Sequence, residues 1–330
     1  MFYPLLFENN LHELVWGGHR LMGMKGLDTL EGHKANEVCI GESWEISAVA
    51  GSESVVLNGE MAGRRLSEVV ALWGSDLVGK RAGGKTDFPL LVKFIDAASD
   101  LSIQVHPNDA LAQARHGKLG KTEMWYVIDA EPGATLLAGF REEIQREEYA
   151  ARVADGSIVD VLARHEVKAG DVFFIPAGRV HAICGGILLC EIQQSSDVTY
   201  RLYDYNRVGL DGKPRELHTE LAQDAIDYHV YPNYRTAYTP TDEGVVRIVD
   251  CDFFVVSMVA TRGSRHRDLK AQDSFVTLSC LEGACTVRCV GGEEVSMRQG
   301  FSCLVPAAVA DYEVTALDGH GVKLLESYTV

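Results

Sequence analysis

The chain has 330 residues, of which 46% are hydrophobic and 24% are charged, a composition typical of a globular protein. Its 31 Lys and Arg residues are outnumbered by 47 Asp and Glu residues, so the formal net charge is −16. This acidic balance argues against binding to nucleic acid or to an anionic membrane surface, because both partners require a basic face. The length predicts about two domains, each large enough to bury a core.

The sequence contains no apolar run that approaches the roughly 20 residues of a membrane span. The N-terminal region lacks the basic segment of a signal peptide and soon reaches Glu8 and Asn9. We therefore expect a cytoplasmic protein whose eight cysteines are reduced thiols. Four of them lie near one another in the sequence without a Cys-x-x-Cys pair, and we expect them to fill a strand-rich core: Cys280, Cys285, Cys289 and Cys303.

Short strand-like runs, broken by Gly, Pro, Asn or Asp, dominate the chain. Apolar residues spaced three and four apart predict a helix over residues 66–73. Strands are expected at 88–95, 101–106, 124–128, 171–176 and 186–192. The charged, periodic segment 141–163 should form one or two helices, and 217–225 a further short one. Many short strands with few helices predict a mainly β fold, either a sandwich or a barrel.

An internal repeat organises the strand-rich segments. Residues 170–181 and 300–311 both begin with Gly and carry Pro-Ala at the same later positions. Upstream of them, residues 124–135 resemble residues 276–286. We therefore predict two copies of one β-barrel.

The two copies should differ chemically. Asp311 stands where the first copy has His181. A boundary between the copies is expected near Pro240, which lies in the polar stretch 238–244.

Four residues on the predicted strands are candidate metal ligands. Gln104 and His106 are two residues apart, so their side chains share one face of a strand. Glu123 opens the next strand, and His181 follows a later Pro-Ala-Gly turn. Two imidazoles and a carboxylate suit Zn²⁺ or another divalent ion, and the Gln104 amide oxygen could add a fourth ligand. A lone His is more often a hydrogen-bonded core residue, but three candidate ligands facing one barrel favour a metal site.

Four charged residues lie on or beside the same strands: Lys93, Lys121, Glu191 and Arg201. Charges are rarely buried without partners, so each of them could be an ion pair or an edge residue. Together, beside a metal, they could bind an anion and move protons.

Seven segments occur in a characteristic order from residue 15 to residue 201. They are Val15-Trp-Gly-Gly18, Gly41-Glu-Ser-Trp-Glu45, Pro89-Leu-Leu-Val-Lys93, Leu101-Ser-Ile-Gln-Val-His-Pro-Asn-Asp109, Gly120-Lys-Thr-Glu-Met-Trp-Tyr126, Ile175-Pro-Ala-Gly178 with His181, and Asp197-Val-Thr-Tyr-Arg201. In these segments the chain resembles the short bacterial form of the type I mannose-6-phosphate isomerases, also called phosphomannose isomerases. The Gln-Val-His-Pro-Asn-Asp and Lys-Thr-Glu-Met-Trp-Tyr blocks are specific.

The resemblance implies a mainly β fold of two cupin (jelly-roll β-barrel) domains with short helical insertions. Residues 1–240 would form the catalytic, metal-binding cupin, with a helical segment near 141–163. Residues 241–330 would form a metal-free, cupin-like C-terminal domain. The implied ligands of one Zn²⁺ per chain, or of another divalent ion, are Gln104, His106, Glu123 and His181.

The implied activity is the interconversion of D-mannose 6-phosphate and D-fructose 6-phosphate by metal-assisted proton transfer through an enediol. Arg201 would be an essential active-site arginine, with Glu191 or Lys121 as the proton carrier. Lys93 and Arg201 are the candidates for contacting the substrate, and Arg201 could also stabilise the enediol charge. The expected partner is a small sugar phosphate, with neither nucleic acid nor membrane, and the oligomeric state stays open.

Two other functions fit parts of the pattern. A non-catalytic sugar-binding or regulatory cupin would be favoured by a degraded metal site, but all four ligand positions and Arg201 are present. A metal-dependent oxygenase would use a two-His, one-carboxylate site, which His106, Glu123 and His181 could form. The seven matching segments favour the isomerase over both.

Overall fold

The computed structural model describes residues 2–80, 88–291, 294–317 and 319–330. The chain folds into two compact units. The central unit comprises Leu11–Ser43 and Phe94–Thr236, and the terminal unit comprises Met1–Asn10, Trp44–Lys93 and Ala237–Val330. The catalytic and metal-free roles assigned to residues 1–240 and 241–330 stay a prediction.

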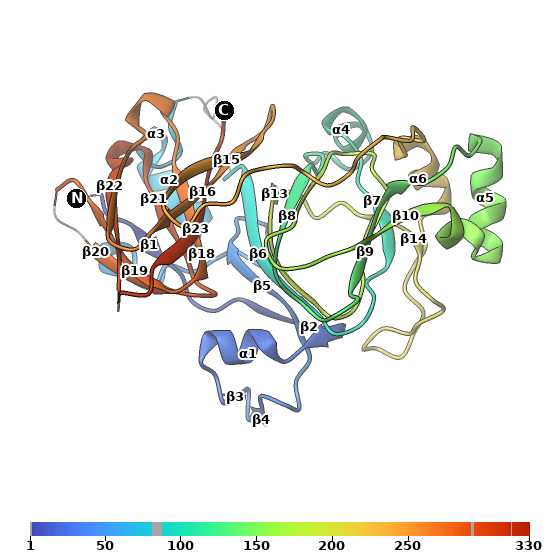
Figure 1. Cartoon of the computed structure of the whole chain (residues 1–330), viewed down its shortest axis with the longest axis horizontal. Coiled ribbons are helices and arrows are strands. Elements are labelled where there is room, and N and C mark those ends of the chain that lie inside the picture. Colours follow the sequence, from blue (N-terminus) through green and yellow to red (C-terminus); the bar gives the residue numbers. More distant parts are fainter. Residues whose placement is uncertain (1, 81–87, 292–293, 318) are drawn as a thin grey trace. The chain divides into compact units, whose positions relative to one another are not determined.

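Two antiparallel sheets form the central unit (Figure 1). The first has the order β10-β9-β12-β7-β14, with β7 (Ile103–Val105), β9 (Thr135–Phe140), β10 (Leu162–Glu166), β12 (His181–Ile183) and β14 (Tyr200–Tyr203). The second has the order β11-β8-β13-β6-β2-β5, with β2 (Leu11–Gly18), β5 (Ile40–Ile46), β6 (Leu90–Ala97), β8 (Glu123–Ala130), β11 (Val172–Ile175) and β13 (Ile187–Gln194). Strands β5 and β6 continue into the terminal unit. Every residue of β13 is buried, because both of its faces are covered.

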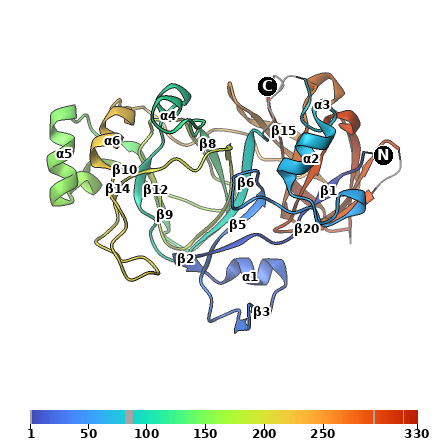
Figure 2. The same ribbon diagram turned by 180° about the vertical axis from the view of Figure 1, so that it is seen from behind.

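Short helices and one small hairpin connect these strands. They are α1 (Arg20–Lys25), α4 (Asp109–His116), α5 (Arg146–Asp155), the 3-10 helix η2 (Ser157–Val161) and α6 (Thr219–Ala225), together with the hairpin β3 (Thr29–Leu30) and β4 (His33–Lys34). Helices α5 and α6 lie side by side in both views (Figures 1 and 2), and the Asp224 carboxylate joins them by an ion pair to Arg146. The helices expected within 141–163 and 217–225 are therefore confirmed.

Two further antiparallel sheets form the terminal unit. The larger has the order β1-β21-β18-β23-β16-β15, with β1 (Leu5–Leu6), β15 (Gly244–Asp250), β16 (Val255–Thr261), β18 (Val276–Glu282), β21 (Ser302–Val305) and β23 (Val322–Tyr328). The smaller has the order β17-β22-β19-β20, with β17 (Ser264–Asp268), β19 (Ala284–Cys289), β20 (Glu294–Arg298) and β22 (Asp311–Ala316). The terminal unit also contains short helices: η1 (Gly59–Met61), α2 (Leu66–Trp73), α3 (Ser75–Val78), η3 (Lys270–Gln272) and η4 (Ala307–Val309). Helix α2 confirms the predicted helix over 66–73, and its apolar face is buried.

The predicted repeat is visible in the strand order. The orders β11-β8-β13-β6 and β10-β9-β12-β7 in the central unit reappear as β21-β18-β23-β16 and β20-β19-β22-β17 in the terminal unit. Each strand of the first set thus corresponds to the strand numbered ten higher. This correspondence allows positions in the two copies to be compared by their register.

The four clustered cysteines lie in the core of the terminal unit. Cys280, Cys285 and Cys303 are fully buried, Cys289 is nearly so, and all four pack in one apolar cluster with strands of both sheets. They are free thiols, as the core-filling interpretation predicts. Within the described ranges, every helix is too short or too polar to cross a membrane.

A buried ion pair in the terminal unit should contribute strongly to stability. Both Glu326 oxygens accept hydrogen bonds from Arg267, at 2.8 and 2.7 Å, and one of them also accepts from the Tyr312 hydroxyl. Glu326 is fully buried and the Arg267 side chain is 21% exposed, so Glu326→Gln leaves a largely covered guanidinium without its counter-charge. We expect the free energy of unfolding to fall by about 3 kcal/mol, measured by urea unfolding followed by circular dichroism.

The control for this experiment is Glu282→Gln. Glu282 lies 3.2 Å from Lys323, but its side chain is 65% exposed, and such surface pairs contribute roughly 0–1 kcal/mol. Equal losses of stability in the two variants would contradict the special role of the buried pair.

Candidate metal centre and active site

The first sheet of the central unit presents three of the predicted site residues in one row. Gln104 on β7 lies opposite His181 on β12 and, across its other edge, opposite Arg201 on β14. Residues directly opposite in antiparallel strands project to the same face of the sheet. The sheet register therefore places Arg201 on the face that carries both predicted ligands.

The second sheet supplies the acidic side of the site. Glu123, at the start of β8, lies opposite Gln193 on β13, and Trp125 lies opposite Glu191. Since residues two apart share a face of a strand, Glu123, Trp125 and Glu191 project together. The Trp125 indole N–H donates to Glu191 Oε2 at 2.9 Å.

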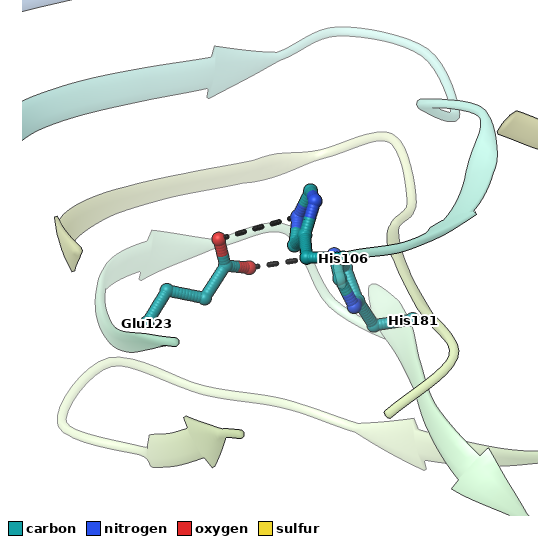
Figure 3. A group of neighbouring side chains, drawn as sticks. All are labelled: His106, Glu123 and His181. Atoms are coloured by element: carbon teal, nitrogen blue, oxygen red, sulfur yellow. Dashed lines mark ion pairs between the residues drawn. The ribbon is translucent and has the colours of Figure 1, made fainter. Parts of the chain in front are cut away.

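His106, Glu123 and His181 meet in a buried cluster whose ligand atoms all lie within 4.8 Å of one another. Figure 3 shows the Glu123 carboxylate facing the two imidazole rings. Its oxygens lie 3.5 Å from His106 Nε2 and 3.4 Å from His181 Nε2. Ligand atoms at bond lengths of about 2.0–2.2 Å around a tetrahedral Zn²⁺ are separated by about 3.4 Å. Both separations between Glu123 and the imidazoles therefore match those around a tetrahedral divalent ion.

The protonation of both imidazoles is set by main-chain carbonyls. His106 Nδ1 lies 3.0 Å from the Val198 carbonyl oxygen, and His181 Nδ1 lies 2.8 Å from that of Arg179. A carbonyl only accepts hydrogen bonds, so each Nδ1 carries a proton, and in a neutral ring Nε2 then presents its lone pair toward Glu123. Burial also lowers the pKa of His181 to about 3, which keeps this ring neutral.

Lys121 links the cluster to Glu191. Its ammonium lies 2.5 Å from Glu123 Oε2, 3.2 Å from His106 Nε2 and 3.8 Å from Glu191 Oε1. Burial opposes the charged ammonium, but Glu123 and Glu191 outweigh this effect and raise the pKa of Lys121. Two carboxylates thus contact one ammonium, and a divalent cation held by Glu123 would add positive charge beside them.

The Gln104 amide lies at the edge of this cluster. Its nitrogen is 3.3 Å from His181 Nε2, and a half-turn of the amide exchanges nitrogen for oxygen at this position. Its place therefore fits the expected fourth ligand, a role that stays a prediction.

Arg201 is held by neutral groups. Its Nη1 donates to the Glu216 carbonyl at 2.8 Å, and its Nε donates to the Ser102 hydroxyl at 3.3 Å. Burial, and then the neighbouring charge of Arg215, lower the pKa of Arg201, although a guanidinium stays charged at physiological pH. Both of these hydrogen-bond partners are uncharged. The positive charge of Arg201 is therefore suited to an anionic ligand.

Lys93 belongs to the terminal unit. It is buried on β6, with its ammonium 4.6 Å from the centre of the Trp44 ring, a distance typical of a cation–π contact. Its role as a substrate contact stays a prediction.

Sequence reasoning did not assign a role to Trp125 or to the two carbonyls that fix the imidazoles. Trp125 lies in the specific Lys-Thr-Glu-Met-Trp-Tyr block, two residues after Glu123. That two-residue spacing places Trp125 on the same strand face as Glu123 and could have indicated it. Nothing in the sequence indicates the carbonyls of Val198 and Arg179, because every residue carries a carbonyl group.

The equivalent place in the terminal unit has different chemistry. Asp311 lies opposite Asp268, as His181 lies opposite Gln104, and Val276 lies opposite Val305 where Glu123 lies opposite Ile175. The Lys270 ammonium is 2.7 Å from the Asp311 carboxylate. The second copy thus has Val276 at the position of Glu123, and a Lys–Asp ion pair at the position of His181.

A buried two-His, one-carboxylate cluster that could hold a metal ion, in a duplicated fold of antiparallel sheets, is typical of the cupin class. Comparison with known proteins makes this specific. Residues 5–134 match the family described as phosphomannose isomerase type I, catalytic domain, and residues 245–323 match the mannose-6-phosphate isomerase cupin domain.

Individual relatives resemble this chain over almost its whole length. Mannose-6-phosphate isomerase ManA of Bacillus subtilis is 37% identical over 317 residues, covering 94% of this chain and 95% of the relative. The mannose-6-phosphate isomerase of Streptococcus mutans is 36% identical, covering 94% of each. A crystal structure of the Bacillus subtilis mannose 6-phosphate isomerase aligns with a TM-score of 0.85 at 30% identity, covering 98% and 99% of the two chains. The chain therefore belongs to the type I phosphomannose isomerase family of aldose–ketose isomerases.

Proposed function

We propose that this chain interconverts D-mannose 6-phosphate and D-fructose 6-phosphate, with one divalent ion held by His106, Glu123, His181 and Gln104. The observation that carries the proposal is the pair of imidazoles whose Nε2 lone pairs face the two oxygens of one buried carboxylate. Membership of the isomerase family supports the reaction. The charged sugar phosphate substrate also agrees with the cytoplasmic location expected from the sequence.

Zn²⁺ is the proposed ion, because neutral imidazoles and a carboxylate at these separations suit it. Other divalent ions accept the same ligands. When bound, such an ion supplies a Lewis acid that stabilises negative charge on a sugar oxygen.

Glu191 and Lys121 are the proposed proton-transfer pair. Glu191 takes the proton from C2 of the open-chain aldose while the C1 carbonyl oxygen gains a proton from solvent water, which gives the enediol. Glu191 then returns its proton to C1, and the C2 hydroxyl gives its proton back to water as the ketone forms. Because its two carboxylate neighbours raise the pKa of Lys121, its ammonium stays charged and is suited to donate a hydrogen bond to the sugar oxygen on which negative charge develops.

Arg201 and Lys93 are the proposed substrate contacts. The Arg201 guanidinium shares the face of the predicted ligands and stabilises negative charge on the enediol or the open-chain oxygens. Lys93 would add a second positive charge for the phosphate, inside a protein of net charge −16.

Chelation and metal return test this function directly. The purified protein should convert mannose 6-phosphate to fructose 6-phosphate in an assay coupled to a dehydrogenase. Activity should disappear after a chelator is added and removed by dialysis, and should return with one equivalent of Zn²⁺. A folded, Zn²⁺-loaded protein without turnover would refute the isomerase and favour a sugar-binding cupin.

A further inference from the structure

We propose that Trp125 is a positioning residue of the isomerase reaction, which acts by fixing the carboxylate of Glu191. This inference rests on the proposed function of Glu191 as proton carrier. It concerns a side chain that binds neither the metal nor the substrate in the mechanism above.

The contact that carries the proposal is a buried hydrogen bond. The Trp125 indole N–H donates to Glu191 Oε2 at 2.9 Å, and the two side chains are 1% and 3% exposed. The other oxygen, Oε1, lies 3.8 Å from the Lys121 ammonium. The two oxygens of Glu191 therefore face different neighbours, and the contacts with Trp125 and Lys121 together orient the plane of the carboxylate.

An indole is well suited to this task. Its N–H is a donor only and does not titrate in the physiological range, so it cannot compete for the proton that Glu191 carries. The ring has two side-chain torsions and is packed in the apolar core of the central unit. A hydrogen bond to an ionised carboxylate is stronger than one between neutral groups, and this one keeps Glu191 Oε2 in a fixed place.

The same ring also contacts a predicted metal ligand. The Trp125 and His181 rings lie 5.3 Å apart, centre to centre, with an angle of 77° between their planes, which is an edge-to-face arrangement. One rigid side chain thus contacts both the proton carrier and the imidazole of the metal cluster. Proton transfer depends on such alignment, because small displacements of reacting groups cost large factors in rate.

The test is Trp125→Phe, which keeps an aromatic ring and removes the N–H. We expect kcat to fall about 10- to 100-fold, which reaches at most the lower end of the range of about 10²–10⁴ that general acid–base catalysis contributes. Metal content should be unchanged, and KM should change less than kcat. The matched control is Trp16→Phe, because Trp16 is 3% exposed in the same core cluster, and its kcat should stay close to that of the native enzyme.

Two further measurements separate positioning from a general loss of packing. With mannose 6-phosphate deuterated at C2, the isotope effect on kcat should rise in Trp125→Phe, because proton transfer becomes more fully rate-limiting. In a Glu191→Ala background, Trp125→Phe should change kcat less than about twofold, because coupled residues are not additive.

The outcomes are distinguishable. An unchanged isotope effect, or an equal loss of kcat in both backgrounds, would overturn the role of Trp125 while leaving Glu191 as proton carrier. Native kcat in Glu191→Ala alone would overturn the proposed function of Glu191 and the inference with it. A large loss in Trp16→Phe would assign the effect to core packing and also overturn the inference.

Discussion

Replacing Arg201 by Ala should leave the metal in place and lower kcat by about 10²–10³-fold. Arg201 shares the face of the His106–Glu123–His181 cluster through its register with Gln104, yet its side chain donates hydrogen bonds to Ser102 and to the Glu216 carbonyl. Its removal therefore deprives the enediol of a positive charge without removing a ligand. Metal analysis of the purified variant and steady-state kinetics with mannose 6-phosphate check the two parts separately.

Arg201→Lys is the companion variant. Lysine keeps the charge but lacks the planar group of donors, so its kcat should lie between those of Arg201→Ala and the native enzyme. Loss of metal from Arg201→Ala would instead show that Arg201 supports the structure of the site.

Glu123→Gln should remove both the metal and the turnover. The substitution keeps the shape of the side chain but deletes the charge that faces both imidazoles and the Lys121 ammonium. A divalent ion would then lie beside an ammonium without the carboxylate that separates their charges. We expect metal affinity to fall by at least about 100-fold, the upper end of the effect seen for residues that only support ligands.

The control is Glu131→Gln, the same change at an exposed position just after β8. It should retain native metal content and native activity. Affinity is measured by competition with a chelating dye and activity by the coupled assay. Full metal occupancy in Glu123→Gln would exclude Glu123 as a ligand.

The helices that could be predicted are those whose buried residues recur with the helical period. Helix α2 carries its apolar residues on one face, so the spacing of these residues in the sequence indicates a helix. Helix α4 was missed because only Ala112 is buried in it, which leaves no apolar stripe to detect. Its signal was local instead: the Asn108 side chain accepts a hydrogen bond from the Leu111 N–H, a typical N-cap.

The sequence predicts which residue types form the site better than it predicts how the strands bring them together. Strand alternation brings Gln104 and His106 to one face, and the structure brings His106, Glu123 and His181 together as expected. Strand pairing between segments 77 residues apart, which joins Gln104 to His181, leaves no local trace in the sequence. The hydrogen bond from Trp125 to Glu191 likewise depends on the register of β8 and β13, which only the folded sheet defines.

The pairing of β1 with β21 affects the order in which the two units can fold during synthesis. Leu5 pairs in register with Leu304, so β1 can pair only after the much later strand β21 has been synthesised. The central unit, in contrast, has all of its residues once Thr236 has been added. Domains generally fold as units during synthesis. The central unit, which carries His106, Glu123 and His181, can therefore form its sheets while the terminal unit is still incomplete.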